Sequence, residues 1–408
     1  MPPIRPMLAS LTRHRLTVLL LALQVTATFA IVCNTGFMIA LRTAQSRQPS
    51  GLVENQLVTL GSVDIGRGEL PLVRHAADLA ALRSVAGVQS AVAVDTLPLT
   101  HDDWSNGVST SPGGDGGIRG VSASAYNGTP GELSTLGLKL LEGRDFHPDE
   151  YLPEGIPQDW NGIDKVAVTI VTRALAQRLF PGRPALGRDI YLSGDHPTRI
   201  VGVVEHLLRP QLREAGAGEY AMLFPMLPDG HAVTYVLRTA AADRERVLKD
   251  ASAALLRLDG ERILSHARTF AQWRNDYFRR DRSMIGLLLA TAAGMLLVTA
   301  IGIAGLASFW VQQRRRSIGV RRALGASRGE ILRYFQVENL LIVGLGVAFG
   351  VMAAYALNAM LMRVDELPRL PWPYLPAVAA ALCLTGQLAA LGPARRAAAV
   401  PPASAVRG

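Results

Sequence analysis

Long apolar runs and one large mixed block alternate along the 408-residue chain. The apolar runs cover residues 16–41, 284–311, 340–362 and 371–391, and none of them contains a charged residue. Each reaches the roughly 20 residues that a helix needs to cross a hydrocarbon core of about 30 Å. The pattern therefore predicts four transmembrane helices, one before the mixed block and three after it.

The first apolar run has a second interpretation, as a cleaved signal peptide. Its length exceeds the usual apolar region of a signal peptide, which is about 7–15 residues. Because three more spans follow, we expect an uncleaved membrane anchor.

The mixed block between the first two spans predicts an α+β domain. Its two ends each have a strand–helix–strand pattern: residues 55–62, 73–84 and 88–97 at the start, and residues 232–239, 243–258 and 262–267 at the end. Two βαβ units of this kind predict a split ferredoxin-like (porter-like) subdomain. A mixed α/β subdomain at about residues 118–228 would be inserted between its halves.

The inserted part has its own pattern. Strands are predicted at 166–170, 188–192 and 199–204, and a short helix at 172–180. Residues 105–117, rich in Ser and Gly, are expected to form a flexible loop ahead of it.

The net charge of +9 is concentrated beside the apolar runs. Thirteen of the 42 Lys and Arg residues lie within residues 5–15, 314–333 and 395–407, where Glu330 is the single acidic residue. Basic flanks mark the cytoplasmic side of a membrane, so these three stretches are expected in the cytoplasm and the mixed block outside. The charge distribution argues against a nucleic-acid partner.

Motifs for catalysis and cofactor binding are missing from the sequence. It has no HExxH spacing and no Walker A motif, and its two cysteines, Cys33 and Cys383, lie far apart inside apolar runs. We therefore expect no catalytic residues, no cofactor and no metal site, and we expect any ATP hydrolysis in a separate subunit.

Small residues recur in two of the spans. Gly346 and Gly350 form a GxxxG pair in the third span, and Gly302 and Gly305 lie in the second. Such residues let helix backbones approach closely, within one chain or between two copies. Glycine is also common in membrane helices generally, so both interpretations stay open.

Residues 312–339 connect the second and third spans and are rich in arginine. Gly325 is a natural helix stop, so a helix over 317–324 should end there. Ser327 and Glu330 have the spacing of a capping box that begins the next helix. The first helix could rest on anionic lipid or be offered to a soluble partner, and its composition alone does not decide between them.

This stretch also carries a resemblance to a known family. Residues 314–335, RRRSIGVRRALGASRGEILRYF, resemble the cytoplasmic loop of FtsX/MacB-type permeases of ABC transporters, although Ser317 stands where Glu is frequent. The PARRA run at 393–397 is similar to the family's ending, and Glu338 falls where these permeases often carry a glutamate. In the mixed block, residues 143–146, 166–182 and 200–204 match the pattern of the family's periplasmic core domain.

The resemblance implies a coupling helix that docks on an ATPase. The residues it assigns to coupling are Arg316, Ile318, Gly319, Arg321, Arg322, Ala323, Leu324, Gly325, Ala326 and Ser327. It also implies several partners: an ABC ATPase subunit, a second permease copy or paralogue forming a dimer, membrane lipids, and a periplasmic adaptor as a further candidate.

These expectations give a domain plan and a function. Residues 1–45 form the cytoplasmic N-terminus and first span, 46–282 the periplasmic core domain, and 283–408 an FtsX-like domain with the coupling loop 312–339. The chain is expected to be a multi-pass permease subunit of an ABC transporter in the bacterial inner membrane, coupling a separate ATPase to periplasmic movement by mechanotransmission, in efflux or export. One alternative is a transmembrane regulator of a periplasmic enzyme or sensor, and another is an orphan permease without an ATPase.

Overall fold

The computed structural model describes ten stretches of the chain: residues 15–63, 71–100, 103–113, 121–152, 165–192, 195–212, 218–228, 232–323, 325–364 and 368–399. The chain divides into two compact units. A helical unit comprises Met1–Ser46 and Asp281–Gly408, and an α/β unit comprises Arg47–Arg280.

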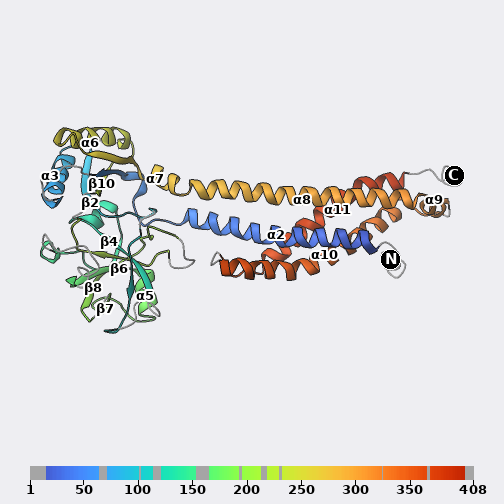
Figure 1. The fold of residues 1–408 in the computed structure, drawn as a ribbon, viewed down its shortest axis with the longest axis horizontal. Helices are drawn as coiled ribbons and strands as arrows, with labels where there is room; N and C mark the ends of the chain where they lie inside the picture. Colours follow the sequence, from blue (N-terminus) through green and yellow to red (C-terminus); the bar gives the residue numbers. More distant parts are fainter. Residues whose placement is uncertain are drawn as a thin grey trace. The chain divides into compact units, whose positions relative to one another are not determined.

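Four long helices and one short helix make up the helical unit in the part of the chain that the structure describes (Figure 1). The long helices are α2 (Arg15–Arg47), α8 (Arg279–Gln313), α10 (Arg328–Val364) and α11 (Tyr374–Ala398). All four are long and apolar enough to cross a membrane. The first three contain the predicted spans completely, and α11 contains the fourth except for residues 371–373. The short helix α9 (Arg315–Ala323) lies between α8 and α10 in sequence.

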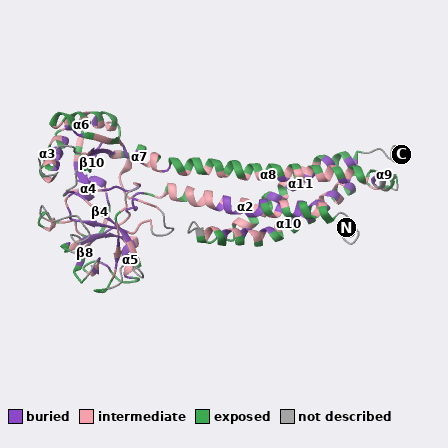
Figure 2. Ribbon diagram, viewed as in Figure 1, coloured by how far each residue is buried: buried purple, intermediate pink, exposed green. Residues whose placement is uncertain are grey.

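Helix α2 forms the centre of this unit. Val25, Phe29 and Cys33 are fully buried, and they belong to a cluster that includes residues of α8, α10 and α11. Figure 2 shows buried positions concentrated on α2, whereas α8 is largely exposed. The exposed side chains of α8 include Leu287, Leu297 and Ile301, so the surface of this helix suits hydrocarbon rather than water.

The smaller sheet of the α/β unit has four strands: β1 (Leu57–Val63), β2 (Val88–Val94), β10 (Ala232–Thr239) and β11 (Ile263–Thr269). Their order is β11-β1-β10-β2, and all neighbours are antiparallel. Helices α3 (Pro71–Arg83) and α6 (Arg244–Leu258) pack on this sheet in one apolar cluster. This is the predicted split ferredoxin-like subdomain, because each βαβ unit places a strand of the other unit between its own two strands.

The larger sheet has seven strands in the order β3-β4-β9-β6-β8-β5, with β7 paired to β8. The strands are β3 (Ser105–Val108), β4 (Val121–Asn127), β5 (Leu140–Gly143), β6 (Val168–Thr172), β7 (Asp189–Tyr191), β8 (Pro197–Val204) and β9 (Ala221–Phe224). The remaining elements of the α/β unit are the helices α4 (Glu132–Leu136), α5 (Arg173–Leu179) and α7 (Phe270–Tyr277) and the 3-10 turns η1 (Glu54–Gln56) and η2 (Pro148–Glu150).

The sequence-based outline of this larger sheet was wrong in two respects. Residues 105–108 form strand β3 rather than a flexible loop, because Asn106 and Val108 are buried against β4. The inserted sheet therefore begins at residue 105 instead of about 118. Strands β4, β5 and β9 were also missed. The later part of the predicted loop, 114–120, lies outside the described residues.

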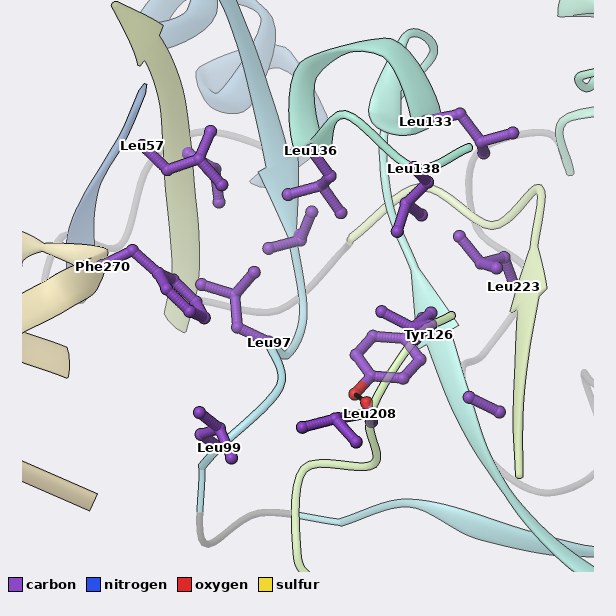
Figure 3. Close-up of a cluster of buried hydrophobic side chains, with 14 of the residues drawn as sticks. Leu57, Leu97, Leu99, Tyr126, Leu133, Leu136, Leu138, Leu208, Leu223 and Phe270 are labelled. Atoms are coloured by element: carbon purple, nitrogen blue, oxygen red, sulfur yellow. Dashed lines mark hydrogen bonds between the residues drawn. The ribbon is translucent and has the colours of Figure 1, made fainter. Parts of the chain in front are cut away.

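The two sheets share one apolar core (Figure 3). Leu57 of β1 and Phe270 of α7 come from the smaller sheet and its surroundings, and Tyr126 of β4 and Leu223 of β9 come from the larger sheet. The Tyr126 hydroxyl donates a hydrogen bond to the carbonyl oxygen of Leu208 inside this core. Because the core is continuous, we expect the two sheets to unfold together.

Candidate functional site

The candidate site is the short helix α9, whose backbone continues directly from α8. The Arg314 N–H donates to the Trp310 carbonyl oxygen at 3.0 Å, and the Ile318 N–H donates to the Arg314 carbonyl oxygen at 2.9 Å. Both are hydrogen bonds of α-helical spacing, so Arg314 joins α8 to α9 without a loop.

A sharp turn at Gly325 separates α9 from α10. Gly325 has φ of +96°, a left-handed conformation that glycine adopts without strain. Two residues later the expected capping box is present: the Ser327 N–H donates to Glu330 Oε2 at 2.9 Å, and the Glu330 N–H donates to Ser327 Oγ at 3.2 Å. The stop and the cap make a tight helical hairpin of α9 and α10.

The two faces of α9 have different surroundings. Ile318 is buried in a cluster with Ile331 and Phe335 of α10 and three alanines of α11 (Ala394, Ala397 and Ala398). Val320 is 47% exposed, and Ala323, three residues further on, is exposed too. Residues three apart share a helix face, so Val320 and Ala323 form an open apolar patch turned away from the bundle.

The structure therefore gives the predicted coupling residues different positions. Ile318 and Gly319 are buried, Ala323, Gly325 and Ser327 are exposed, and Ala326 is half-buried. For Arg316, Arg321 and Arg322 only the helical backbone is described, and Leu324 lies outside the described residues. Val320 was not among the predicted coupling residues, although an apolar side chain between arginines could have indicated it.

An ion pair fastens the start of α9 to α10. Arg314 Nη1 lies 3.1 Å from both carboxylate oxygens of Glu338, whose side chain is 1% exposed. The Arg314 guanidinium also lies over the Trp310 ring, 5.7 Å from its centroid, within the range of a cation–π contact. Glu338 was singled out only by resemblance, and its partner could not be read from the sequence.

A small cavity adjoins this ion pair. It has a volume of about 20 Å³ and is lined by Trp310, Glu338 and Asn339 among others. The Trp310 indole nitrogen and the Asn339 amide nitrogen are buried and have no hydrogen-bond partner among the described residues. A cavity of this size holds about one water molecule.

Three of the four glycines predicted to pack lie against α2. A Cβ on Gly346 would come within 2.6 Å of Val25 Cβ, and one on Gly350 within 2.8 Å of Phe29 Cβ. On α8, a Cβ on Gly302 would lie 2.7 Å from the Gln24 side-chain oxygen, whereas Gly305 has open space. A contact of Gly305 with another chain remains a prediction.

Three polar side chains buried in the α/β unit form hydrogen bonds with one another. Asp78 Oδ2 accepts from the Tyr235 hydroxyl at 2.6 Å and from Arg262 Nη1 at 2.7 Å, and both charged side chains are 2% exposed. Burial, with the nearby Asp78 carboxylate, raises the pKa of Tyr235. Within the described residues, no group of three or more potential metal-ligating side chains comes together.

Glu132, at the start of α4, is a second buried acid in this unit. Its side chain is 3% exposed, and its Oε1 has no hydrogen-bond partner among the described residues. Burial raises the pKa of Glu132 to about 8, and the charges of Asp95 and Asp145 add to the effect. The carboxyl group is therefore mainly protonated at neutral pH.

The fold and the site together define a membrane protein with four candidate spans, a large α/β domain and a short helix between two of the spans. A family model described as MacB-like periplasmic core domain matches residues 16–255, and one described as FtsX-like permease C-terminal matches residues 289–402. The first match covers more than half of the chain. The chain therefore belongs to the MacB/FtsX-type permease family.

Individual relatives are distant. A macrolide export ATP-binding/permease protein MacB of Escherichia coli is 26% identical over 332 residues, which are 78% of this chain and 49% of that protein. The uncharacterized ABC transporter permease YknZ of Bacillus subtilis is 24% identical over 288 residues, 68% of each chain. This chain spans about half the length of the MacB proteins that it matches.

Two of the solved structures that resemble the chain are extracytoplasmic domains. The extracellular domain of YknZ from Gram-positive bacteria has a TM-score of 0.32 at 16% identity and covers 51% of this chain and 99% of that one. The periplasmic region of MacB from Actinobacillus actinomycetemcomitans has a TM-score of 0.34 at 15% identity and covers 54% and 93%.

Proposed function

We propose that this chain is the transmembrane subunit of an ABC transporter complex in a bacterial inner membrane, and that an ATPase subunit docks on α9. The observation that carries the proposal is the open face of α9. Val320 and Ala323 present an apolar patch on a helix that also contains four arginines, Arg315, Arg316, Arg321 and Arg322.

An apolar patch among cationic residues suits a groove in a soluble protein better than the lipid surface alone. Lipid headgroups attract arginine side chains whether or not the helix that carries them is rigid. Binding to lipid alone therefore does not explain why α9 is held between the continuous helix at Arg314 and the capped turn at Gly325. Interfaces bury apolar and arginine side chains together on rigid elements. The hairpin at Gly325 and the cap at Ser327 supply that rigidity.

The proposed mechanism is mechanotransmission in the direction of export. The 408 residues contain no Walker A motif, so ATP hydrolysis is assigned to an ATPase outside them. Relatives named for macrolide export and pyoverdine export motivate the export direction. The four apolar runs contain no charged residue, which gives no support to an ion-conducting path through the bundle.

Purification from native membranes tests the proposal. The tagged full-length chain would be extracted in mild detergent, and Mg-ATP hydrolysis and its inhibition by vanadate would be measured in the eluate. We expect vanadate-sensitive hydrolysis to elute with the chain. Hydrolysis no greater than that recovered with an unrelated tagged membrane protein would contradict the proposal.

A further inference from the structure

The ion pair between Arg314 and Glu338 lies at the joint where α8 becomes α9. Both carboxylate oxygens of Glu338 are 3.1 Å from the same guanidinium nitrogen. Glu338 is 1% exposed and the Arg314 side chain 21% exposed, so the contact is shielded from water. Separating the pair would leave a buried charge without this partner, and such a contact resists opening more strongly than a surface pair does.

A second attachment lies one helical turn further along α9. Ile318 is four residues after Arg314 and packs in the same cluster as Ile331 and Phe335 of α10. On α10, residues 331, 335 and 338 follow an i, i+4, i+7 spacing and so share one face. Arg314 and Ile318 share a face of the α8–α9 helix in the same way.

These contacts align the two arms of the hairpin around Gly325. Ile318 meets Ile331 and Phe335 in the middle of the arms, and Arg314 meets Glu338 at their open end. The arms are therefore fixed at two points in addition to the turn. Figure 1 shows α9 at one end of the bundle, between α8 and α10.

Helix α11 joins the same assembly. Its alanines Ala394, Ala397 and Ala398 complete the cluster around Ile318, and its Gln387 Nε2 donates to the Gln336 carbonyl oxygen of α10 at 3.1 Å. A displacement of α9 would therefore meet α10 and α11 through direct contacts.

We propose that Arg314 and Glu338 are positioning residues that lock α9 to α10, so that movement of α9 is passed to α10 and α11 instead of being absorbed by bending at residue 314. The ion pair supplies the polar contact at the open end of the hairpin, next to Val311, which packs against the apolar cluster. This inference rests on the proposed function, because the docked ATPase is the source of the movement.

The lock has a specific consequence for variants. The open patch at Val320 and Ala323 does not include the ion pair, so loss of the pair should leave ATPase docking intact. Loss of the pair should instead reduce the nucleotide-dependent structural change at the C-terminal end of α10, the end farther from α9 in sequence. Residues 365–373 join α10 to α11 there. In the described part of this segment, 368–373, the Leu370 N–H donates to Asn358 Oδ1 of α10 at 3.0 Å.

The experiment compares two single charge-reversal variants with the double variant that carries both changes, each in the complete complex in lipid nanodiscs. The variants are Arg314→Glu, Glu338→Arg and the double exchange, and Arg199→Glu, in an exposed ion pair of the α/β unit, is the control. Two quantities are measured: the molar ratio of ATPase recovered with the permease, and the difference in hydrogen exchange of residues 368–373 with and without vanadate-trapped nucleotide.

We expect all variants to recover the ATPase as the unmodified chain does. The nucleotide-dependent exchange difference should fall about tenfold in each single reversal, a typical size for coupling between sites, and should return in the double exchange. A single reversal that keeps the full difference would overturn the lock, as would a double exchange that fails to restore it. Loss of ATPase recovery in the single reversals would also overturn it, because the pair would then shape the docking surface.

Two further results keep the test decisive. If the reversals aggregate, Glu338→Gln retains the shape of the side chain without its charge, and an unreduced exchange difference in that variant contradicts the lock. If the unmodified chain recovers no ATPase, the proposed function fails, and this result is obtained before any variant is compared. An unmodified complex that binds ATPase but shows no exchange difference at 368–373 contradicts the lock alone.

Discussion

Gly350 of α10 lies so close to Phe29 of α2 that a Cβ on the glycine would come within 2.8 Å of the Phe29 Cβ. For Gly346, one turn earlier, the corresponding distance to the Val25 Cβ is 2.6 Å. The Thr26 hydroxyl donates to the Gly346 carbonyl oxygen at 3.0 Å, and Asn34 Nδ2 donates to the Ala354 carbonyl oxygen at 3.0 Å. The two helices therefore meet through backbone as well as side chains, which is the use that small residues have in membrane helices.

This contact predicts that Gly346→Ala destabilises the helical unit, whereas Gly344→Ala does not. Both changes give α10 the same gain in helix propensity. Gly344 has open space, but a methyl group at Gly346 would overlap Val25. We expect the free energy of unfolding of Gly346→Ala to be lower than that of Gly344→Ala by about 1–3 kcal/mol, the usual cost of overpacking. Unfolding by SDS in mixed micelles, followed by circular dichroism, measures it, and equal values would show that the helices separate easily here.

A second prediction concerns the buried contact between Asp78 and Arg262 in the α/β unit. Asp78→Ala would leave Arg262 and the Tyr235 hydroxyl without this acceptor, and we expect a loss of about 3–5 kcal/mol in the free energy of unfolding. Asp189→Ala removes the corresponding group of the exposed pair with Arg199 and should cost less than about 1 kcal/mol. Thermal unfolding of the two full-length variants provides the comparison. Similar costs for both would mean that Arg262 finds another partner.

The raised pKa of Glu132 predicts a pH dependence of stability. In the folded chain this carboxyl group keeps its proton up to about pH 8, whereas the unfolded chain releases it near pH 4.5. The folded state therefore binds more protons between these values, and stability falls as pH rises through this window. The slope contributed by one group is at most about 1.4 kcal/mol per pH unit.

Replacing Glu132 with Gln should remove that slope. Unfolding of the full-length chain would be measured at several values between pH 5 and pH 8, with Glu245→Gln on the exposed surface of α6 as the matched control. We expect the Glu132→Gln chain to have a flatter pH profile than both the unmodified and the control chains. Parallel profiles for all three would contradict the raised pKa.

The parts of the fold that could be predicted from sequence are those with strong local signals. The charge-free apolar runs predicted the spans, and Gly325 with the Ser327–Glu330 spacing predicted the turn and the cap. The strands of the smaller sheet have regular apolar patterns, and β10 was predicted with its observed ends.

The missed strands lack such signals. Strand β3 has the sequence SNGV, and β4 has VSASAYN, in which small and polar residues replace the usual branched side chains. They become strands because they pair with each other and with β9. The contact between Arg314 and Glu338 also depends on tertiary structure. These residues are 24 apart in sequence and meet only once the hairpin has formed, so the sequence alone could not predict the pair.

The central claim is that α9 docks an ATPase, and Val320→Asp tests it most directly. The change places a carboxylate in the open apolar patch, while Val73→Asp makes the same replacement at a helical position of similar exposure on α3. Each chain would be purified from native membranes, and the vanadate-sensitive ATP hydrolysis recovered per mole of chain would be measured. We predict that Val320→Asp lowers the recovered activity at least about tenfold, because burying an unpaired charge at an interface opposes binding, and that Val73→Asp leaves it unchanged. Equal recovery from both variants would contradict docking on α9.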